Sequence, residues 1–182
     1  MKGFRREDLT FSLCGLNCGL CPMHVGGYCP GCGGGEGNQS CAVARCSLAH
    51  VGVAYCWQCG EYPCVRYQAE DEYDTLITTQ HRKADMARMM AMGPEAYRQE
   101  QERKAAMLQA LLARHNDGRR KSLYCLAVNL LSEDEVRAVL QRLDEMTDAT
   151  VKERAALAAA MLQDAAKRQQ VELRMRKKKS EK

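Results

Sequence analysis

The chain has 182 residues, a formal net charge of +4 and eleven cysteines. Its length fits one domain or two small ones, and the small excess of basic residues indicates no class of partner. No apolar run approaches the roughly 18 residues of a membrane-spanning helix, and the N-terminal sequence lacks the features of a secretory signal. We therefore expect a cytoplasmic protein with no membrane association, in which closely spaced cysteines are metal ligands more readily than disulfides.

Cysteines dominate the first third of the chain. Ten of the eleven lie between residues 14 and 64, and several are separated from the next by only two to four residues. Two cysteines at such a spacing can direct both sulfurs toward one ion, because a tight turn brings them to the same side. The spacing predicts metal ligation, with a disulfide-stapled region as the open alternative. The candidate ligands are Cys14, Cys18, Cys21, Cys29, Cys32, Cys41, Cys46, Cys56, Cys59 and Cys64.

Composition divides the chain near residue 65. Residues 1–65 hold twelve of the fourteen glycines and few large apolar residues, so this segment cannot build a large core and needs staples. Residues 66–182 are rich in strong helix formers. We predict a mainly α protein with a small irregular metal-bound module. The glycine-rich, Cys-ligated region over 1–65, of zinc-ribbon, zinc-knuckle or cluster-binding type, would pack on a helical bundle over 66–182.

The second part divides into helices at recognisable start and stop signals. Gly93 ends one apolar pattern, Pro94 can begin the next helix, and Gly118 follows a further stop. We expect the apolar faces to pack together as a small bundle. We favour core positions for the methionines Met86, Met89, Met90 and Met92. The predicted helices cover about 66–92, 94–115, 123–131 with a possible cap at Ser122, a segment after a capping box of Ser132 and Glu135, and a segment that begins at Thr147 or Asp148.

The remaining cysteine and the histidines give weaker signals. Cys125 lies in the most apolar segment, where a lone cysteine is usually a small buried hydrophobe. His24 and His50 follow Cys21 and Cys46 closely and would raise the number of candidate ligands to twelve. We favour solvated loop residues for both histidines, and whether either is a ligand stays open.

Two segments resemble one family. Residues 14–22, CGLNCGLCP, and residues 56–64, CWQCGEYPC, are similar to the opening and closing motifs of uncharacterised bacterial and archaeal cysteine-rich proteins, catalogued only as a domain of unknown function. Residues 118–127, GRRKSLYCLA, also resemble that family, so the resemblance covers most of the chain. The family often has a further cysteine where this chain has Asn38. The resemblance implies metal binding without a known reaction.

Zinc and iron–sulfur chemistry both suit this cysteine pattern. Structural zinc takes four thiolate or imidazole ligands in a closed tetrahedron, and ten cysteines can supply two such sites. The spacing of Cys14, Cys18 and Cys21 is also the one with which radical S-adenosylmethionine enzymes hold a [4Fe–4S] cluster. This chain lacks the alternating strands and helices of those enzymes, but thiolates in a glycine-rich loop suit iron as well. We expect zinc, with a [4Fe–4S] cluster as the alternative cofactor.

No Ser-His-Asp set, phosphate loop or carboxylate pair suggests a reaction. We therefore predict a metal-binding protein whose structural zinc sites support an intracellular binding or regulatory module, with a protein as a possible partner. The alternative is an iron–sulfur protein in electron transfer or cluster-assisted chemistry. The basic C-terminal tail, which includes residues 174–179, could contact the phosphates of a nucleic acid. A solvated helix end is the favoured interpretation of that tail.

Overall fold

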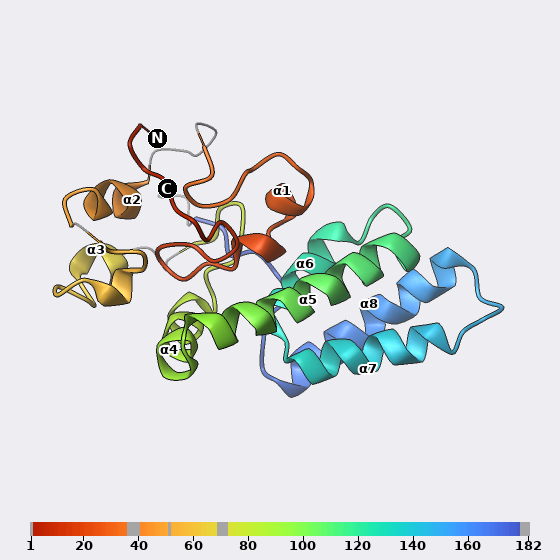
Figure 1. Cartoon of the computed structure of the whole chain (residues 1–182). Coiled ribbons are helices and arrows are strands. Elements are labelled where there is room, and N and C mark those ends of the chain that lie inside the picture. The colour runs from red at the N-terminus through yellow and green to blue at the C-terminus, as the bar shows by residue number, and fades with distance from the viewer. Residues whose placement is uncertain (1, 36–40, 51, 69–72, 179–182) are drawn as a thin grey trace. The chain divides into compact units, whose positions relative to one another are not determined.

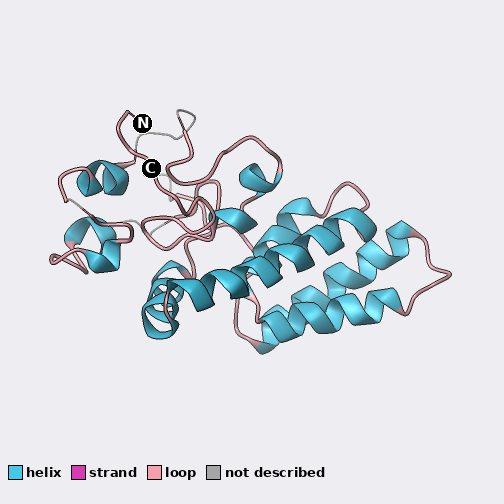
Figure 2. Cartoon of the chain, viewed as in Figure 1, coloured by secondary structure: helices cyan, strands magenta, loops and turns pink. Residues whose placement is uncertain are grey.

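The computed structural model describes residues 2–35, 41–50, 52–68 and 73–178. Within these ranges all regular structure is helical and no strand is present (Figure 2), which confirms the prediction of a mainly α protein. No described helix is long and apolar enough to cross a membrane. Asn38 and Lys179 lie outside the described residues. The helices (Figure 1) are η1 (Cys18–Leu20), α1 (Pro22–Val25), α2 (Ala42–Ser47), η2 (Cys56–Gln58), α3 (Val65–Gln68), α4 (Arg82–Met92), α5 (Pro94–Arg114), α6 (Lys121–Leu130), α7 (Glu133–Asp144) and α8 (Val151–Arg168).

The chain forms two compact units. The first, here called the cysteine unit, consists of Met1–Arg98 and Met175–Lys182. The second, here called the helical unit, consists of Gln99–Arg174. The change in composition near residue 65 falls inside the cysteine unit, because α3 and α4 belong to it. These helices supply apolar side chains that residues 1–65 lack.

The cysteine unit has an aromatic core that joins its loops to α4 and the start of α5. Phe11 lies between Tyr55 and Tyr97, with ring centroids 6.0 and 4.8 Å away. Met86 and Met89 pack in the same cluster and are completely buried, as predicted. Such aromatic pairs contribute roughly 1 kcal/mol each beyond the burial of their area. The core therefore fixes the cysteine-bearing loops against regular helices. Met90 and Met92, which we also expected in a core, are 47% and 42% exposed, so that part of the prediction is wrong.

The predicted helix over residues 66–92 is wrong in its middle. Helix α3 ends at Gln68, and α4 begins only at Arg82. In the segment between them that the structure describes, the Asp74 carboxylate accepts hydrogen bonds from the backbone N–H and the hydroxyl of Thr79, at 2.8 and 3.0 Å. Side-chain bonds of this kind compete with the helical backbone ladder. Apolar periodicity does not reveal them.

The C-terminal tail also differs from expectation. Helix α8 ends at Arg168, and the Arg176 side chain donates hydrogen bonds to Asp74 Oδ1 at 3.0 and 3.3 Å. The Asp74 backbone N–H donates to the Arg176 carbonyl, and the Arg176 backbone N–H donates to Asp74 Oδ2. The Asp74 side chain is fully buried. A solvated tail is therefore the wrong interpretation for Arg176, although Arg174 is exposed.

Within the helical unit, α7 and α8 lie side by side in opposite directions and α6 packs against both (Figure 1). Cys125 is 2% exposed in this core, which confirms it as a buried residue. Helix α5 begins at Pro94 as predicted. Two predicted caps are wrong. Helix α6 begins at Lys121, so Ser122 lies inside the helix and does not cap it. Helix α8 begins after Thr150, which forms a capping box with Glu153, and not at Thr147 or Asp148.

Ser132 precedes α7 as predicted, but it forms no capping box with Glu135. Its hydroxyl accepts a hydrogen bond from the Gln169 side chain at 3.0 Å, and its backbone N–H donates to the same amide at 3.3 Å. Glu135 instead binds Arg168 at 2.7 Å. Both partners come from the end of α8, so contacts between helices replace the local cap.

Candidate metal centres

Tight loops place the first cysteines against α4. Gly15 has a φ of +99°, and a Cβ atom at this position would lie 2.7 Å from the Arg82 carbonyl oxygen. Gly31 has a φ of +94°, and its Cβ would lie 2.2 Å from the Leu9 carbonyl oxygen. Only glycine fits both the conformation and the space. These two residues let the segments around Cys14 and Cys32 pack against their neighbours.

Five cysteines of these loops influence one another and are here called the loop group. They are Cys14, Cys18, Cys21, Cys29 and Cys32. Burial raises the pKa of Cys18 well above its ordinary value, and the charges of the other four thiolates would raise it further. Burial also raises the pKa of Cys14 to about 11, against the opposing effects of the Ser12 hydroxyl, 3.3 Å from its sulfur, and of Arg82. Such thiols stay neutral near pH 7 unless a cation offsets their charge.

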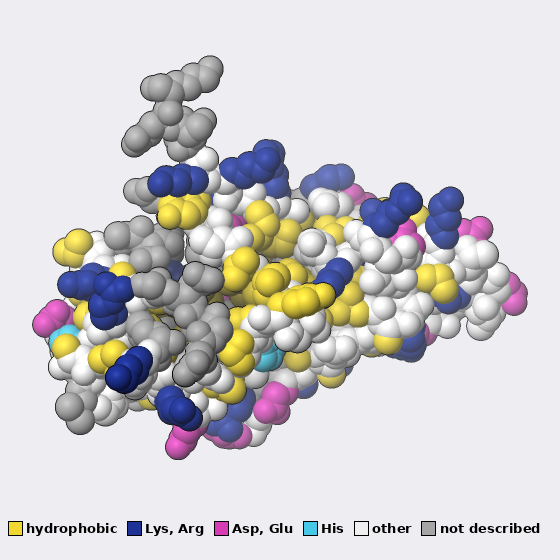
Figure 3. Space-filling view, turned by 90° about the horizontal axis from the view of Figure 1, so that it is seen from above, with side chains coloured by type: hydrophobic (Ala, Val, Ile, Leu, Met, Phe, Trp, Pro, Cys, Tyr) yellow, Lys and Arg dark blue, Asp and Glu magenta, His cyan; other side chains and the backbone are white. Residues whose placement is uncertain are grey.

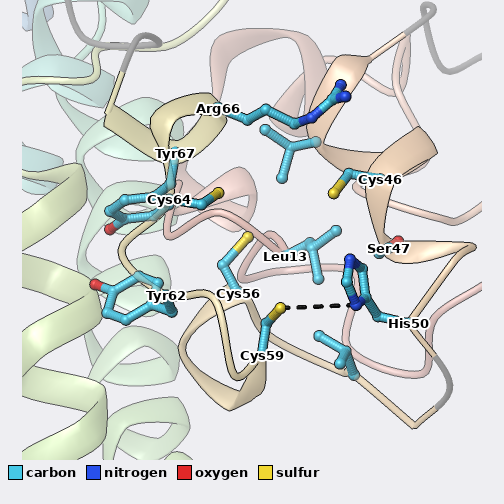
Figure 4. A pocket seen from close by; sticks show the side chains of 12 residues that line it. Leu13, Cys46, Ser47, His50, Cys56, Cys59, Tyr62, Cys64, Arg66 and Tyr67 are labelled. Carbon is cyan, nitrogen blue, oxygen red and sulfur yellow. Dashed lines mark hydrogen bonds between the residues drawn. The ribbon is translucent and has the colours of Figure 1, made fainter.

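A second set, the cavity group, consists of Cys46, Cys56, Cys59 and Cys64. Together with His50 they line a cavity of about 30 Å³. Figure 4 shows the four cysteine side chains on the wall of this cavity, with the Leu13 side chain among them. A volume of this size holds one or two groups as large as water, so the cavity fits a single ion.

Short elements fix the cavity group. Cys56 and Cys59 stand at the two ends of the 3-10 turn η2, where the Cys59 N–H donates to the Cys56 carbonyl at 3.1 Å. The Cys56 N–H donates to the Leu13 carbonyl at 2.8 Å, which ties this turn to the loop before Cys14. Burial raises the pKa of Cys56 to about 12, and the charge of Cys14 adds to the increase. The two groups therefore adjoin.

The other predicted candidates lie as follows. Cys41 is exposed at the start of α2, although its charge acts on Cys14 and Cys32. His24 Nδ1 lies 3.0 Å from the Cys29 carbonyl oxygen. His50 Nδ1 lies 3.9 Å from the Cys59 sulfur. Thus His50, which we expected to be a solvated loop residue, faces the cavity group.

The sequence pattern did not mark two arginines that approach the cysteines. Arg82 is 2% exposed, donates to the Cys14 carbonyl at 3.2 Å and places its guanidinium 4.2 Å from the centre of the Tyr67 ring. Arg6 donates to the carbonyls of Asp8 and Phe11 at 2.8 Å. Its charge and hydrogen bonding partly offset the burial that raises the pKa of Cys32. No local sequence pattern identifies an arginine that donates to backbone carbonyls of distant segments.

The described residues do not contain a preformed metal site. In those ranges no three His, Cys, Asp or Glu side chains are placed so that they could hold one ion. None of the cysteines there forms a disulfide. The donor set of the cavity group nevertheless fits a thiophilic ion in kind and number, since zinc takes four thiolate or imidazole ligands. Metal ligation stays a prediction.

Comparison with protein-family models, with curated proteins and with solved structures gives no match to this chain. The resemblance to the uncharacterised cysteine-rich family therefore stays an expectation from the motifs.

Proposed function

We propose that this protein binds metal through its N-terminal cysteines and that zinc sites stabilise the cysteine unit as a binding or regulatory module. The observation that carries this proposal is the gathering of four sulfurs around one ion-sized cavity (Figure 4). They come from the end of α2, from both ends of η2 and from the residue before α3. The remaining lining is largely apolar and includes Leu13, Val43 and Val53, so a bound ion would find its ligands only among these sulfurs and His50.

The energetics of the unit support the same proposal. Its loops are rich in glycine, and among the described residues they have a second small core made of Phe4, Leu13, Val43 and Ala44. Buried thiols of raised pKa add little stability by themselves. A divalent cation would favour their thiolate forms, and in small modules the free energy of metal binding is available for folding. We therefore assign the sites a structural role.

An iron–sulfur cluster is the second candidate, and the surroundings of the loop group favour it. The Ser12 hydroxyl lies 3.3 Å from the Cys14 sulfur, and the Leu13 N–H donates to the Cys32 sulfur. Hydrogen bonds to sulfur tune the potential of such clusters. In this case the protein would act in electron transfer or cluster-assisted chemistry.

The proposed partner is a protein, and a cytoplasmic location remains our expectation. Nucleic acid is the weaker candidate. Of the basic tail residues that the structure describes, Arg176 is bound to Asp74. On the face that Figure 3 shows, the visible Lys and Arg side chains stand in separate small groups.

Metal analysis of protein purified without oxygen tests the proposal. A colourless protein with stoichiometric zinc supports structural zinc sites. A brown protein with broad visible absorption and equimolar iron and sulfide supports the cluster. Protein that is folded, fully reduced and free of both metals would contradict both candidates.

A further inference from the structure

The cavity group has as many thiols as one closed zinc site takes, but they would have to reorient to bind an ion, because no three of them are placed so that they could hold one. The side chains of Cys46, Cys56, Cys59 and Cys64 line the cavity, and a closed tetrahedral zinc site takes four ligands. No member of the loop group lines this cavity. The structure thus separates four of the ten candidate cysteines from the others, which their order in the sequence did not do.

His50 occupies a different position from the four sulfurs. Its Nδ1 atom lies 3.9 Å from the Cys59 sulfur (Figure 4). Of the five donors, only His50 also lines a larger surface groove of about 910 Å³, where Arg5 and Thr10 lie. His50 therefore borders both the cavity and the groove.

We propose that Cys46, Cys56, Cys59 and Cys64 bind one zinc ion as an all-thiolate centre, and that His50 is a positioning residue which donates an N–H to the Cys59 sulfur. This assignment rests on the proposed function. Four thiolates around Zn²⁺ leave two excess negative charges. A donor to one sulfur stabilises that charge and orients the ligand, as partners of metal ligands commonly do.

The position of His50 also implies a route by which the ion exchanges. Because His50 lines both the cavity and the groove, we expect a chelator or a metal donor to reach the centre from the groove past the imidazole. Loss of the imidazole should expose the Cys59 sulfur without removing a ligand. We expect His50→Ala to keep the metal stoichiometry and to release the ion to a chelator about tenfold faster.

Single substitutions in the full-length zinc protein test the assignment. Cys46→Ser, Cys56→Ser, Cys59→Ser and Cys64→Ser should each lower the zinc content by one equivalent per chain. Cys125→Ser, in the helical unit, is the matched cysteine control. His24→Ala is the matched histidine control, because His24 contacts a backbone carbonyl in the same unit. Both controls should keep the content and the release rate of the wild type.

A second measurement does not depend on the folding of the cysteine variants. Co²⁺ replaces zinc, and the energies of its d–d absorption bands depend on how many ligands are thiolates. Wild type and His50→Ala should give the same bands, because the imidazole is not a ligand in this assignment.

The outcomes are distinguishable. Loss of one zinc equivalent in His50→Ala, with a changed cobalt spectrum, would make His50 a ligand and overturn the assignment. Full zinc content in Cys64→Ser would do the same. Unchanged release kinetics in His50→Ala would contradict the positioning role alone. Wild-type protein without bound metal would instead contradict the proposed function itself.

Discussion

Arg176 and Asp74, 102 positions apart in the chain, form an ion pair at 3.0 Å around a carboxylate that is fully buried. Burial by itself would raise the pKa of Asp74, but hydrogen bonds from the backbone of Thr79 and from Arg176 outweigh it, and the pKa lies below its ordinary value. The same loop contacts the loop group, because the Cys21 thiol donates to the Leu76 carbonyl at 3.4 Å. The end of the chain thus holds the segment that covers a candidate ligand.

Arg176→Ala should destabilise the cysteine unit by about 2 kcal/mol, because it leaves a buried carboxylate without its cation. Arg174→Ala is the control. Arg174 is exposed and its ion pair with Glu172 measures 3.9 Å, so its removal should change the free energy of unfolding by less than about 0.5 kcal/mol. Urea unfolding of the metal-loaded proteins measures both. Equal stability of the two variants would show that the ion pair contributes nothing.

The tail gives a separate prediction about nucleic acid. Because Arg176 is engaged by Asp74, truncation after Leu173 should reveal no loss of nucleic-acid affinity. Fluorescence anisotropy with a short duplex at low and moderate salt decides this, since phosphate contacts weaken steeply with salt. Submicromolar binding at moderate salt that the truncated protein lacks would make nucleic acid the first candidate partner. Truncation should, however, lower stability through the loss of Arg176.

Gly15→Ala should be far more harmful than Gly3→Ala. Both glycines have positive φ, +99° and +79°, so each substitution costs about 1 kcal/mol from conformation alone. A methyl group at Gly15 would also lie 2.7 Å from the Arg82 carbonyl oxygen, whereas nothing lies within 4 Å of one at Gly3. We expect a total cost of about 3 kcal/mol at Gly15 and reduced zinc content. A similar loss of stability in both variants would mean that the close approach to α4 is unimportant.

His115 should make the helical unit less stable in mild acid. Burial lowers its pKa, Arg114 and Arg154 lower it further, and Asp144 at 3.6 Å opposes them. The unfolded chain, with a pKa of about 6.5, then binds a proton more readily than the folded one. The free energy of unfolding should fall as the pH decreases through that value and level off beneath the folded pKa.

Urea unfolding between pH 8 and pH 5, followed by helical circular dichroism, measures this dependence. His115→Gln, which cannot ionise, should have a flatter pH profile than the wild type. If the free energy of unfolding depends on pH identically in the wild type and in His115→Gln, His115 is not the source of the acid sensitivity.

Metal removal should affect the two units differently. A chelator with a reductant should make residues 1–64 sensitive to protease, because the free energy of metal binding contributes to their folding. Helices α6, α7 and α8 bury their own apolar faces and should keep most of their helicity. Limited proteolysis with mass spectrometry, alongside circular dichroism, locates the cleavages. Full protection of residues 1–64 in metal-free, reduced protein would contradict the structural role.

The sequence alone determined what depends on neighbours along the chain. Pro94 begins α5 as its fixed φ predicts. The methionine-rich composition of α4 correctly predicted core positions for Met86 and Met89, but not for Met90 and Met92, which are exposed. The apolar surroundings of Cys125 likewise predicted its burial. The cysteine spacing predicts a chemical class of site that stays a prediction, and the glycine content correctly indicated irregular structure in the first third of the chain. Each of these features is encoded within a few residues.

Tertiary structure alone decided what depends on contacts between distant segments. The grouping of Cys46 and Cys64 with the η2 cysteines requires α2, η2 and α3 to meet, and no local pattern encodes that meeting. The break between α3 and α4 involves Asp74, whose second partner is at the far end of the chain. Arg82 follows the same rule, because a buried polar group binds whatever partner the fold brings near. Periodicity reports which face of an element is apolar, but it does not report which other element covers that face.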